Sequence, residues 1–260
     1  MNVKRFTVLA ALITLLSMLL TVSGCSGGSV VTPEDFKDFT RLDIQNAFDV
    51  QVIQSGTYSV EITSSKALLD YLSVTKEGET LTVKLSPNHP FTDFVLMRKI
   101  LKAKITLPVL RGLTLSDASR ASVRGFESTN ALDLNISGAS TVELNGIETG
   151  DVNIEVSGAS DLSGKLTAGN VKFLISGASH AELDGTAKDI QLDASGASKV
   201  GLERFVNETA TVTLSGATQA TMDTRNQLDF SLSGASRFFF LSNPHVGKQE
   251  VLGASTVKHK

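Results

Sequence analysis

The sequence contains little of what usually stabilises small secreted domains or builds catalytic centres. Of its 260 residues one is cysteine and none is tryptophan, while tyrosine occurs twice and proline five times. A single cysteine excludes an internal disulfide. The metal-binding spacings CxxC and HExxH and the phosphate-binding P-loop are also absent. We therefore expect no cofactor and no metal site.

A secretory signal of the lipoprotein type is predicted at the start of the chain. Lys4 and Arg5 precede an uncharged, mostly apolar run over residues 6–22, which is the pattern of a secretory signal. The run ends in VSGC, which resembles a lipobox except that Val22 stands where leucine is usual. We predict that Cys25 is lipidated and anchors the protein to a membrane, because several acyl chains hold far more strongly than one. The alternative is an incidental cysteine at the end of a signal peptide.

The composition divides the chain into three segments. Residues 1–24 are the predicted signal peptide, residues 25–35 a lipid-anchored tether, and residues 36–260 a single domain. Within that domain, residues 36–110 are rich in hairpin signals and residues 111–260 carry a repeat. Removal of the signal takes away two basic residues and no acid, which leaves 22 basic and 27 acidic side chains and a net charge of about −5. This charge argues against a nucleic-acid partner, which requires a basic surface.

A four-residue motif recurs through the C-terminal part. SGAS begins at residues 137, 157, 176, 195 and 233, with SGAT at 215, LGAS at 252 and SDAS at 116. Spacings of 18 to 21 residues are typical of a solenoid whose coils stack on one another. Apolar residues alternate with polar ones before each motif, as in a strand with one buried face. The residues directly before the motif are Ile136, Val156, Ile175, Ala194, Leu214 and Leu232.

Each motif is predicted to form a corner between two strands, because glycine reaches backbone conformations that are closed to other residues. The alternation is expected to shift by one residue across the Ser-Gly pair, which would turn the motif alanines inward. A catalytic nucleophile requires one serine in one special environment, whereas this serine recurs in every coil. We therefore predict that the serines are structural, with hydroxyls that bond across neighbouring turns. The alanines in question are Ala139, Ala159, Ala178, Ala197, Ala217, Ala235 and Ala254.

The predicted fold is all-β. Two or three short strands per coil indicate a right-handed parallel β-helix of about seven to eight coils. Upstream, residues 48–53, 58–62 and 81–85 also alternate. Turn signals at Ser55-Gly56 and Glu77-Gly78 separate these stretches, so antiparallel hairpins are expected to lead into the β-helix.

The order of these segments resembles a known family. FDVQVIQSGTYSVEI, GETLTVKL and AKITLPVLRGLTLSDAS, followed by the SGAS coils, resemble the head GIN domain, also named as an auto-transporter adhesin domain, over roughly residues 40–258. The resemblance implies a β-helical envelope lipoprotein of a Gram-negative bacterium and supplies no catalytic motif. Ser26 after the predicted lipidated cysteine favours the outer membrane, by resemblance to known sorting preferences.

An apolar connection, PNHPFTDFVLMRK, departs from the strand pattern over residues 87–99. It contains Phe91, Phe94, Val95, Leu96 and Met97. One interpretation is a lid over the open end of the solenoid, which would prevent edge pairing. The other is a partner-binding or self-association loop formed by its large apolar residues, with Phe91, Phe94, Leu96 and Met97 as the candidates.

One outward column combines three groups able to exchange protons. Asp161, His180 and Lys199 each follow a motif by one residue, so they should lie on adjacent coils about 5 Å apart. An acid, an imidazole and an amine in line could form a general acid/base site. The alternative is an exposed ladder of opposite charges worth a few tenths of a kcal/mol per contact.

Three functions follow from the sequence. The first is a non-enzymatic, lipid-anchored binding module for a glycan, a matrix component or another envelope protein. The second is a β-helix polysaccharide lyase or hydrolase, which would need clustered carboxylates on adjacent coils. The third is an accessory or sensor subunit of an envelope complex. The absence of catalytic motifs and the regular coils favour the first, with the membrane as a partner through Cys25.

Overall fold

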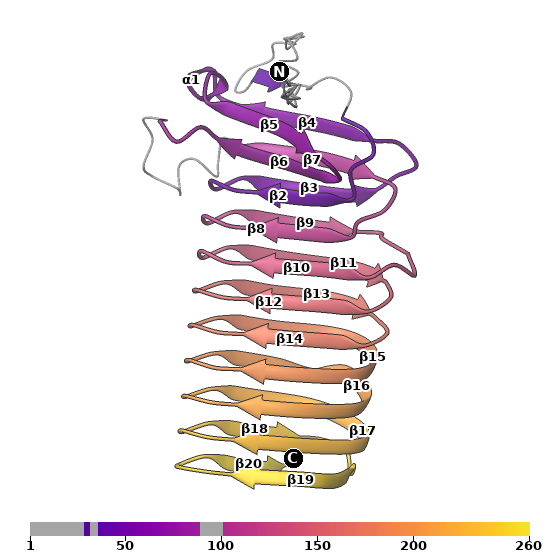
Figure 1. Ribbon diagram of the computed structural model, residues 1–260, viewed down its shortest axis with the longest axis vertical. Coiled ribbons are helices and arrows are strands. Elements are labelled where there is room, and N and C mark those ends of the chain that lie inside the picture. Colours follow the sequence, from indigo (N-terminus) through magenta and orange to yellow (C-terminus); the bar gives the residue numbers. More distant parts are fainter. Residues whose placement is uncertain (1–28, 32–35, 89–100) are drawn as a thin grey trace, which may run out of the picture.

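The chain forms a long rod of stacked coils, shown in Figure 1 as a computed structural model. The structure describes residues 29–31, 36–88 and 101–260. Within these ranges there is no helix of the length and apolar character needed to cross a membrane. The described elements are α1 (Lys66–Leu69) and the strands β1 (Ser29–Val31), β2 (Arg41–Ile44), β3 (Asp49–Gln54), β4 (Ser59–Ser64), β5 (Leu72–Glu77), β6 (Thr80–Leu85), β7 (Lys102–Leu107), β8 (Gly112–Leu115), β9 (Arg120–Arg124), β10 (Leu132–Ile136), β11 (Thr141–Glu148), β12 (Val152–Val156), β13 (Asp161–Thr167), β14 (Val171–Ile175), β15 (His180–Ala194), β16 (Lys199–Leu214), β17 (Gln219–Leu232), β18 (Arg237–Phe240), β19 (His245–Val251) and β20 (Thr256–His259).

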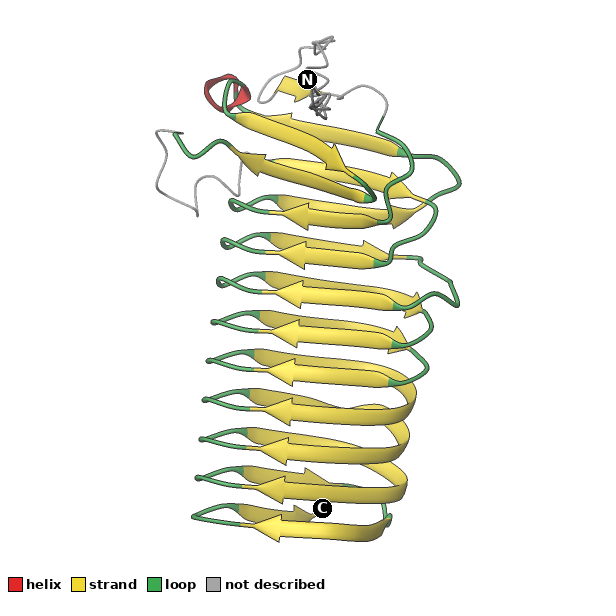
Figure 2. Ribbon diagram, viewed as in Figure 1, coloured by secondary structure: helices red, strands yellow, loops and turns green. Residues whose placement is uncertain are grey.

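Two parallel sheets face each other along the rod (Figure 2). The first sheet contains β8, β10, β12 and β14, and the second contains β9, β11 and β13. Further along, β15, β16 and β17 each run from the second sheet of one coil into the first sheet of the next. The predicted β-solenoid is therefore confirmed. In these later coils the chain passes through the bend after the second sheet without a break in the strand.

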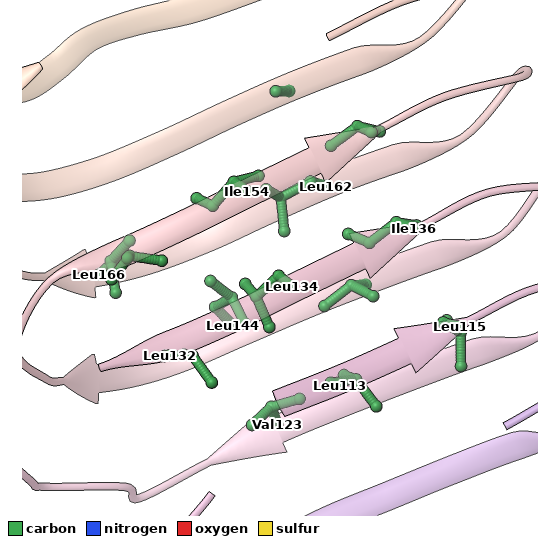
Figure 3. Packing of buried hydrophobic residues seen from close by; sticks show 14 of the residues in the cluster. Leu113, Leu115, Val123, Leu132, Leu134, Ile136, Leu144, Ile154, Leu162 and Leu166 are labelled. Atoms are coloured by element: carbon green, nitrogen blue, oxygen red, sulfur yellow. The ribbon is translucent and has the colours of Figure 1, made fainter. Parts of the chain in front are cut away.

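The core lies between the two sheets (Figure 3). Leu134 and Ile154 from the first sheet meet Leu144 and Leu162 from the second, and all four are at most 2% exposed. The predicted inward positions before each motif are buried in every case from Ile136 to Leu232. Because like residues stack on like residues from coil to coil, each buried side chain is covered on both sides by its neighbours.

The corners differ from the sequence prediction in which residue points inward. The alanines from Ala139 to Ala254 are exposed, whereas the last residue of the motif is buried, as at Ser140 and Ser198. The Ser-Gly-Ala segment therefore lies outside. The last motif residue points inward again, and so does the residue two positions after it, so the inward and outward positions keep the same alternation on both sides of the corner.

In the later corners the inward hydroxyl bonds within its own corner, as where Ser198 Oγ donates to the carbonyl oxygen of Ser195 at 2.8 Å. The longer contact from Ser198 Oγ to the Gly177 carbonyl, 3.4 Å, reaches the neighbouring turn. In the earlier corners the Ser119 and Ser140 hydroxyls are buried and have no hydrogen-bond partner among the described residues.

The first coil lies between later segments of the chain. β2 pairs in parallel with both β6 and β8, and β3 pairs in parallel with both β7 and β9. The predicted hairpin at Glu77-Gly78 is confirmed as the antiparallel pair β5 and β6. The hairpin predicted at Ser55-Gly56 is wrong, because β7 lies between β3 and β4 and pairs with both. A local turn signal does not reveal whether the returning strand joins its predecessor or a strand one place further away.

Antiparallel strands and α1 cover the N-terminal end of the rod. β4 pairs with β7 and β1 pairs with β4, so Ser29–Val31, within the predicted tether, belong to the second sheet. Leu68 of α1 is fully buried. At the other end, Phe238 is buried in the core, and Phe240 is half-buried and stacks on His259 with ring centroids 4.9 Å apart. β18, which carries both phenylalanines, pairs with β17 on one side and with β20 on the other, so these rings pack between coils of the rod.

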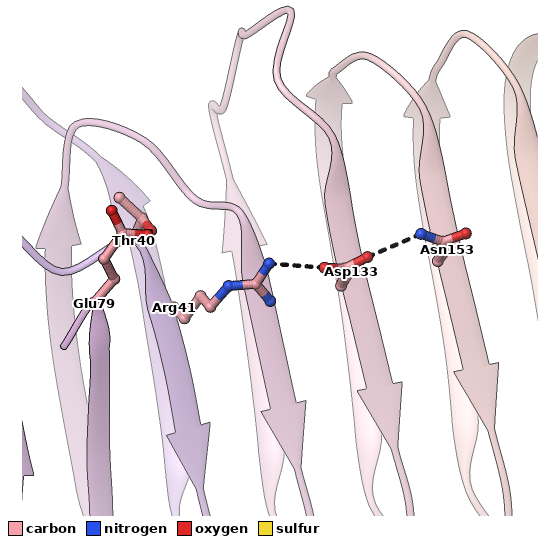
Figure 4. Close-up of polar contacts among 5 residues, drawn as sticks. All are labelled: Thr40, Arg41, Glu79, Asp133 and Asn153. Carbon is pink, nitrogen blue, oxygen red and sulfur yellow. Dashed lines mark hydrogen bonds and ion pairs between the residues drawn. The ribbon is translucent and has the colours of Figure 1, made fainter. Parts of the chain in front are cut away.

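An ion pair ties the N-terminal coil to the SGAS coils across an intervening strand (Figure 4). Arg41 Nη2 donates to Asp133 Oδ2 at 2.9 Å, and Asn153 Nδ2 donates to Asp133 Oδ1 at 2.9 Å. Gly112 of β8 lies between them in register, and a Cβ atom there would be 2.7 Å from Arg41 Nη1. The arginine can cross this strand because Gly112 has no side chain. The Asn153 hydrogen bond, together with the hydrogen bond and charge of Arg41, lowers the pKa of Asp133 although burial opposes the shift.

Replacement of Asp133 by asparagine should destabilise the protein in a pH-dependent way. We expect Asp133→Asn to lower the free energy of unfolding at pH 7 by at most about 1 kcal/mol, because the ion pair is partly exposed. Since the folded pKa is lowered, this stabilisation is present above the unfolded value of about 3.9 and is lost as the pH falls through the folded pKa. Urea denaturation of both proteins at neutral pH and at about pH 2 measures the difference. A difference of the same size at both pH values would contradict the assignment.

Candidate functional site

The outer face of the second sheet carries the column that the sequence singled out. Asp161 of β13 pairs in register with His180 of β15, and His180 pairs with Lys199 of β16. All three side chains lie outside the core, with His180 half-buried. The three residues therefore lie next to one another on successive coils, as predicted.

The contacts within this column are not those of an acid/base relay. His180 Nε2 lies 3.6 Å from Glu182 Oε2, two residues further along the same strand. In the described part of the chain, the Asp161 and Lys199 side chains have no ion pair or hydrogen bond. The imidazole is therefore directed toward a carboxylate in its own coil, and the acid and amine on either side of it stand apart.

A second group of charges, which the sequence analysis did not single out, lies beside this column. Arg204 Nε donates to Asp184 Oδ1 at 2.8 Å, and Arg204 Nη2 lies 3.7 Å from Glu182 Oε1. The hydrogen bond to Asp184 and then its charge raise the pKa of Arg204, with smaller contributions from the charges of Glu182 and Glu203. One guanidinium thus joins two carboxylates from the neighbouring coil.

An extra residue in one coil places Arg204 opposite Asp184. Glu182 pairs with Gly201 but Asp184 pairs with Arg204, so β16 has one more residue than β15 at this bend. Such a bulge redirects the side chains that follow it. The sequence contained a signal for this bulge, because the motif spacing is 20 residues from 195 but 19 from 176.

Glycines hollow the surface next to these charges into an open groove of about 580 Å³. Gly164 has a φ of +127°, and a Cβ atom there would lie 2.0 Å from the Leu144 carbonyl oxygen. Gly146, with a φ of +68°, has no atom within 4 Å of its ideal Cβ position. Gly146 lines the groove, and a Cβ atom added there would lie in open space. Its polar side chains are Asn145, Ser163, Lys165, Glu182, Asp184 and Arg204.

The groove is suited to binding more than to acid/base catalysis. A catalytic acid retains its proton in an apolar, enclosed site, whereas the Glu182 and Asp184 side chains are 54% and 42% exposed and each faces Arg204. Over residues 29–31, 36–88 and 101–260, no three His, Cys, Asp or Glu side chains are grouped to hold a metal ion. The arrangement offers fixed donors and acceptors for hydrogen bonds.

Two other predicted sites fall outside the described residues. These are the lipidation site Cys25 and the apolar connection with Phe91, Phe94, Leu96 and Met97. The described ends of that connection are β6 and β7, which form the coil next to β2 and β3 on the side of the N-terminal antiparallel strands. Both predictions remain predictions.

These features define the protein as a two-sheet solenoid that has small residues at its corners and a polar outer face. The chain belongs to the family described as "Putative auto-transporter adhesin, head GIN domain", whose model matches residues 38–244. The resemblance inferred from the strand order and the SGAS repeat is thereby confirmed. No curated protein matches the sequence.

Solved structures share the fold over almost their whole length. A "Putative lipid binding protein" from Parabacteroides distasonis has a TM-score of 0.77 at 15% identity and is aligned over 91% of this chain and 98% of its own. A putative adhesin from Parabacteroides merdae has a TM-score of 0.72 at 16% identity, covering 90% and 95%. A putative adhesin from Bacteroides fragilis has a TM-score of 0.68 at 17% identity, covering 89% and 97%. At these identities the likeness establishes the fold, and the names of these proteins describe binding, not catalysis.

Proposed function

We propose that this protein is a non-enzymatic, lipid-anchored module of the cell envelope, whose rigid rod binds a glycan, a matrix component or another envelope protein. The groove on the second sheet is the observation that carries the proposal. It combines fixed charges and hydrogen-bonding groups with a floor of strands that are paired on both sides. A site on such strands is held more precisely than one on loops. The family description and the names of the solved relatives support the same class of function.

Retention experiments with the full-length protein test this proposal. Lipid vesicles that carry the protein are passed over immobilised polysaccharides, matrix proteins and envelope extracts, with protein-free vesicles and vesicles carrying the heat-unfolded protein as controls. We expect the folded protein to retain vesicles on at least one of these surfaces. Equal retention of all three vesicle preparations on every surface would contradict a binding function.

Replacement of His180 tests the non-enzymatic part of the proposal. His180 has one exposed carboxylate partner, so we expect His180→Gln to change the free energy of unfolding by at most about 0.5 kcal/mol. We also expect neither the wild type nor the variant to release reducing or unsaturated ends from acidic and neutral polysaccharides. If the wild type cleaves any of them and His180→Gln does not, Asp161, His180 and Lys199 form an active site and the protein is an enzyme.

A further inference from the structure

The charges that line the groove cancel. Lys165 and Arg204 contribute two positive charges, and Glu182 and Asp184 contribute two negative charges. Hydrogen-bond donors stand beside acceptors, because the guanidinium and ammonium groups only donate while the carboxylates only accept. The Asn145 amide and the Ser163 hydroxyl can do both.

This balance discriminates between classes of ligand. An anionic ligand in the groove would approach Glu182 and Asp184, and a cationic ligand would approach Lys165 and Arg204. An apolar ligand would remove these charged groups from water without replacing their hydrogen bonds, which is costly. A hydroxyl group donates and accepts, so an uncharged ligand rich in hydroxyls can pair with both kinds of group at once.

The fold also argues against two other occupants. An extended peptide that adds a strand needs an unpaired strand edge, whereas β11, β13, β15 and β16 beneath the groove are each paired on both sides. An acyl chain needs an apolar cavity. In the adjoining coils the space between the sheets is filled by the protein's own side chains, including Phe173 and Phe205, which are fully buried.

We infer that the groove of Asn145, Gly146, Lys165, Glu182, Asp184 and Arg204 binds an uncharged polysaccharide through its hydroxyl groups. This inference rests on the proposed binding function and assigns its site and ligand class. The groove volume lies within the roughly 300–1,000 Å³ typical of ligand pockets. Because the residues lining it include no aromatic ring for a sugar to stack on, a single site binds weakly, and many copies on one membrane bind tightly through multivalency.

A side chain added at Gly146 tests the site. Asparagine tolerates a positive φ better than most residues, and at Gly146, which lines the groove, its side chain would add bulk in open space. Gly78→Asn is the matched control, because Gly78 also has a positive φ of +57° with no atom within 4 Å of its Cβ position, but lies in the β5–β6 turn. Vesicles carrying each full-length protein are incubated with insoluble neutral, anionic and cationic polysaccharides. We expect Gly146→Asn to reduce retention on the neutral polymer by about tenfold or more and Gly78→Asn to leave it unchanged.

Removal of the guanidinium tests the ligand class. Arg204→Gln leaves a net charge of −1 from Lys165, Glu182 and Asp184, so we expect weaker retention on the neutral polymer and stronger retention on cationic chitosan. Circular dichroism checks that each variant retains the wild-type β structure.

Each other outcome overturns a defined part of the argument. Unchanged retention of Gly146→Asn on the neutral polymer would place the site elsewhere and leave the proposed binding function intact. Wild-type retention on charged polymers alone, or on a protein alone, would overturn the ligand class but not the binding function. Retention on none of the surfaces would overturn both.

Discussion

Replacement of Gly196 by alanine is expected to lower the free energy of unfolding by about 3 kcal/mol or more. Gly196 has a φ of +79°, a conformation that costs a residue with a side chain about 1–2 kcal/mol. A Cβ atom there would also lie 2.3 Å from the Gly177 carbonyl oxygen of the preceding coil. That oxygen accepts the hydrogen bond from the Ala197 amide at 2.8 Å, so the clash cannot be relieved without disturbing the corner ladder. Valine at this position should be worse still.

Gly146→Ala is the matched control for this experiment. Gly146 has a similar φ of +68° but no atom within 4 Å of the Cβ position, so alanine there carries the backbone strain alone, about 1–2 kcal/mol. Ser195→Ala should be nearly neutral, because Ser195 contributes its carbonyl oxygen, not its hydroxyl, to the bond with Ser198. Chemical denaturation of the three variants measures the ranking. Equal losses at Gly196 and Gly146 would show that the coils can separate locally to admit a side chain.

Replacement of Cys25 by serine is expected to release the protein from membranes. The motivation is the VSGC segment after the apolar run and the absence of any other cysteine. Serine cannot carry the thioether-linked lipid, and without buried acyl chains the membrane affinity should fall to background. Flotation of cell membranes on a density gradient, followed by immunodetection, measures the bound fraction.

Ser26→Ala serves as the control, because it changes the neighbouring small residue and leaves the thiol in place. This variant should float with the membranes as the wild type does. Mass spectrometry of the mature wild-type protein should also find a modified cysteine at its N-terminus. A Cys25→Ser variant that still floats after a high-salt wash, or an unmodified N-terminus elsewhere, would refute the lipid anchor.

Much of the solenoid could be predicted because its signal repeats. Each coil presents the same alternation before the motif. A single exception such as Leu174, which is apolar but points outward and is 45% exposed, does not obscure the pattern, because the residues at the same position in other coils are polar.

The corner was predicted in the right place but with the wrong residue inward. Alanine and serine are both small, and hydropathy favours burying the alanine. In the later corners the buried hydroxyl is compensated because it bonds back to the carbonyl three residues earlier, as in Ser198 and Ser195.

The candidate groove was less accessible from the sequence. It depends on which residues of neighbouring coils lie opposite one another, and one extra residue in β16 changes that register at Arg204. Glu182 and Asp184 look like ordinary outward residues of an alternating strand until the guanidinium of the next coil is placed between them. Likewise, Gly146 is one more turn glycine in the sequence and part of a hollow in the structure.

By itself the sequence determined the all-β class, the stacking of equivalent residues in successive coils, the positions of the corners and the family. These properties depend on local alternation and on a period near 19 residues, both of which are written along the chain. Only the tertiary structure decided that β7 lies between β3 and β4, that Arg41 reaches Asp133 across Gly112, and that a groove with balanced charges lies on the second sheet. Those features arise from contacts between residues distant in sequence, whose register depends on bulges and missing side chains that leave little trace in the local pattern.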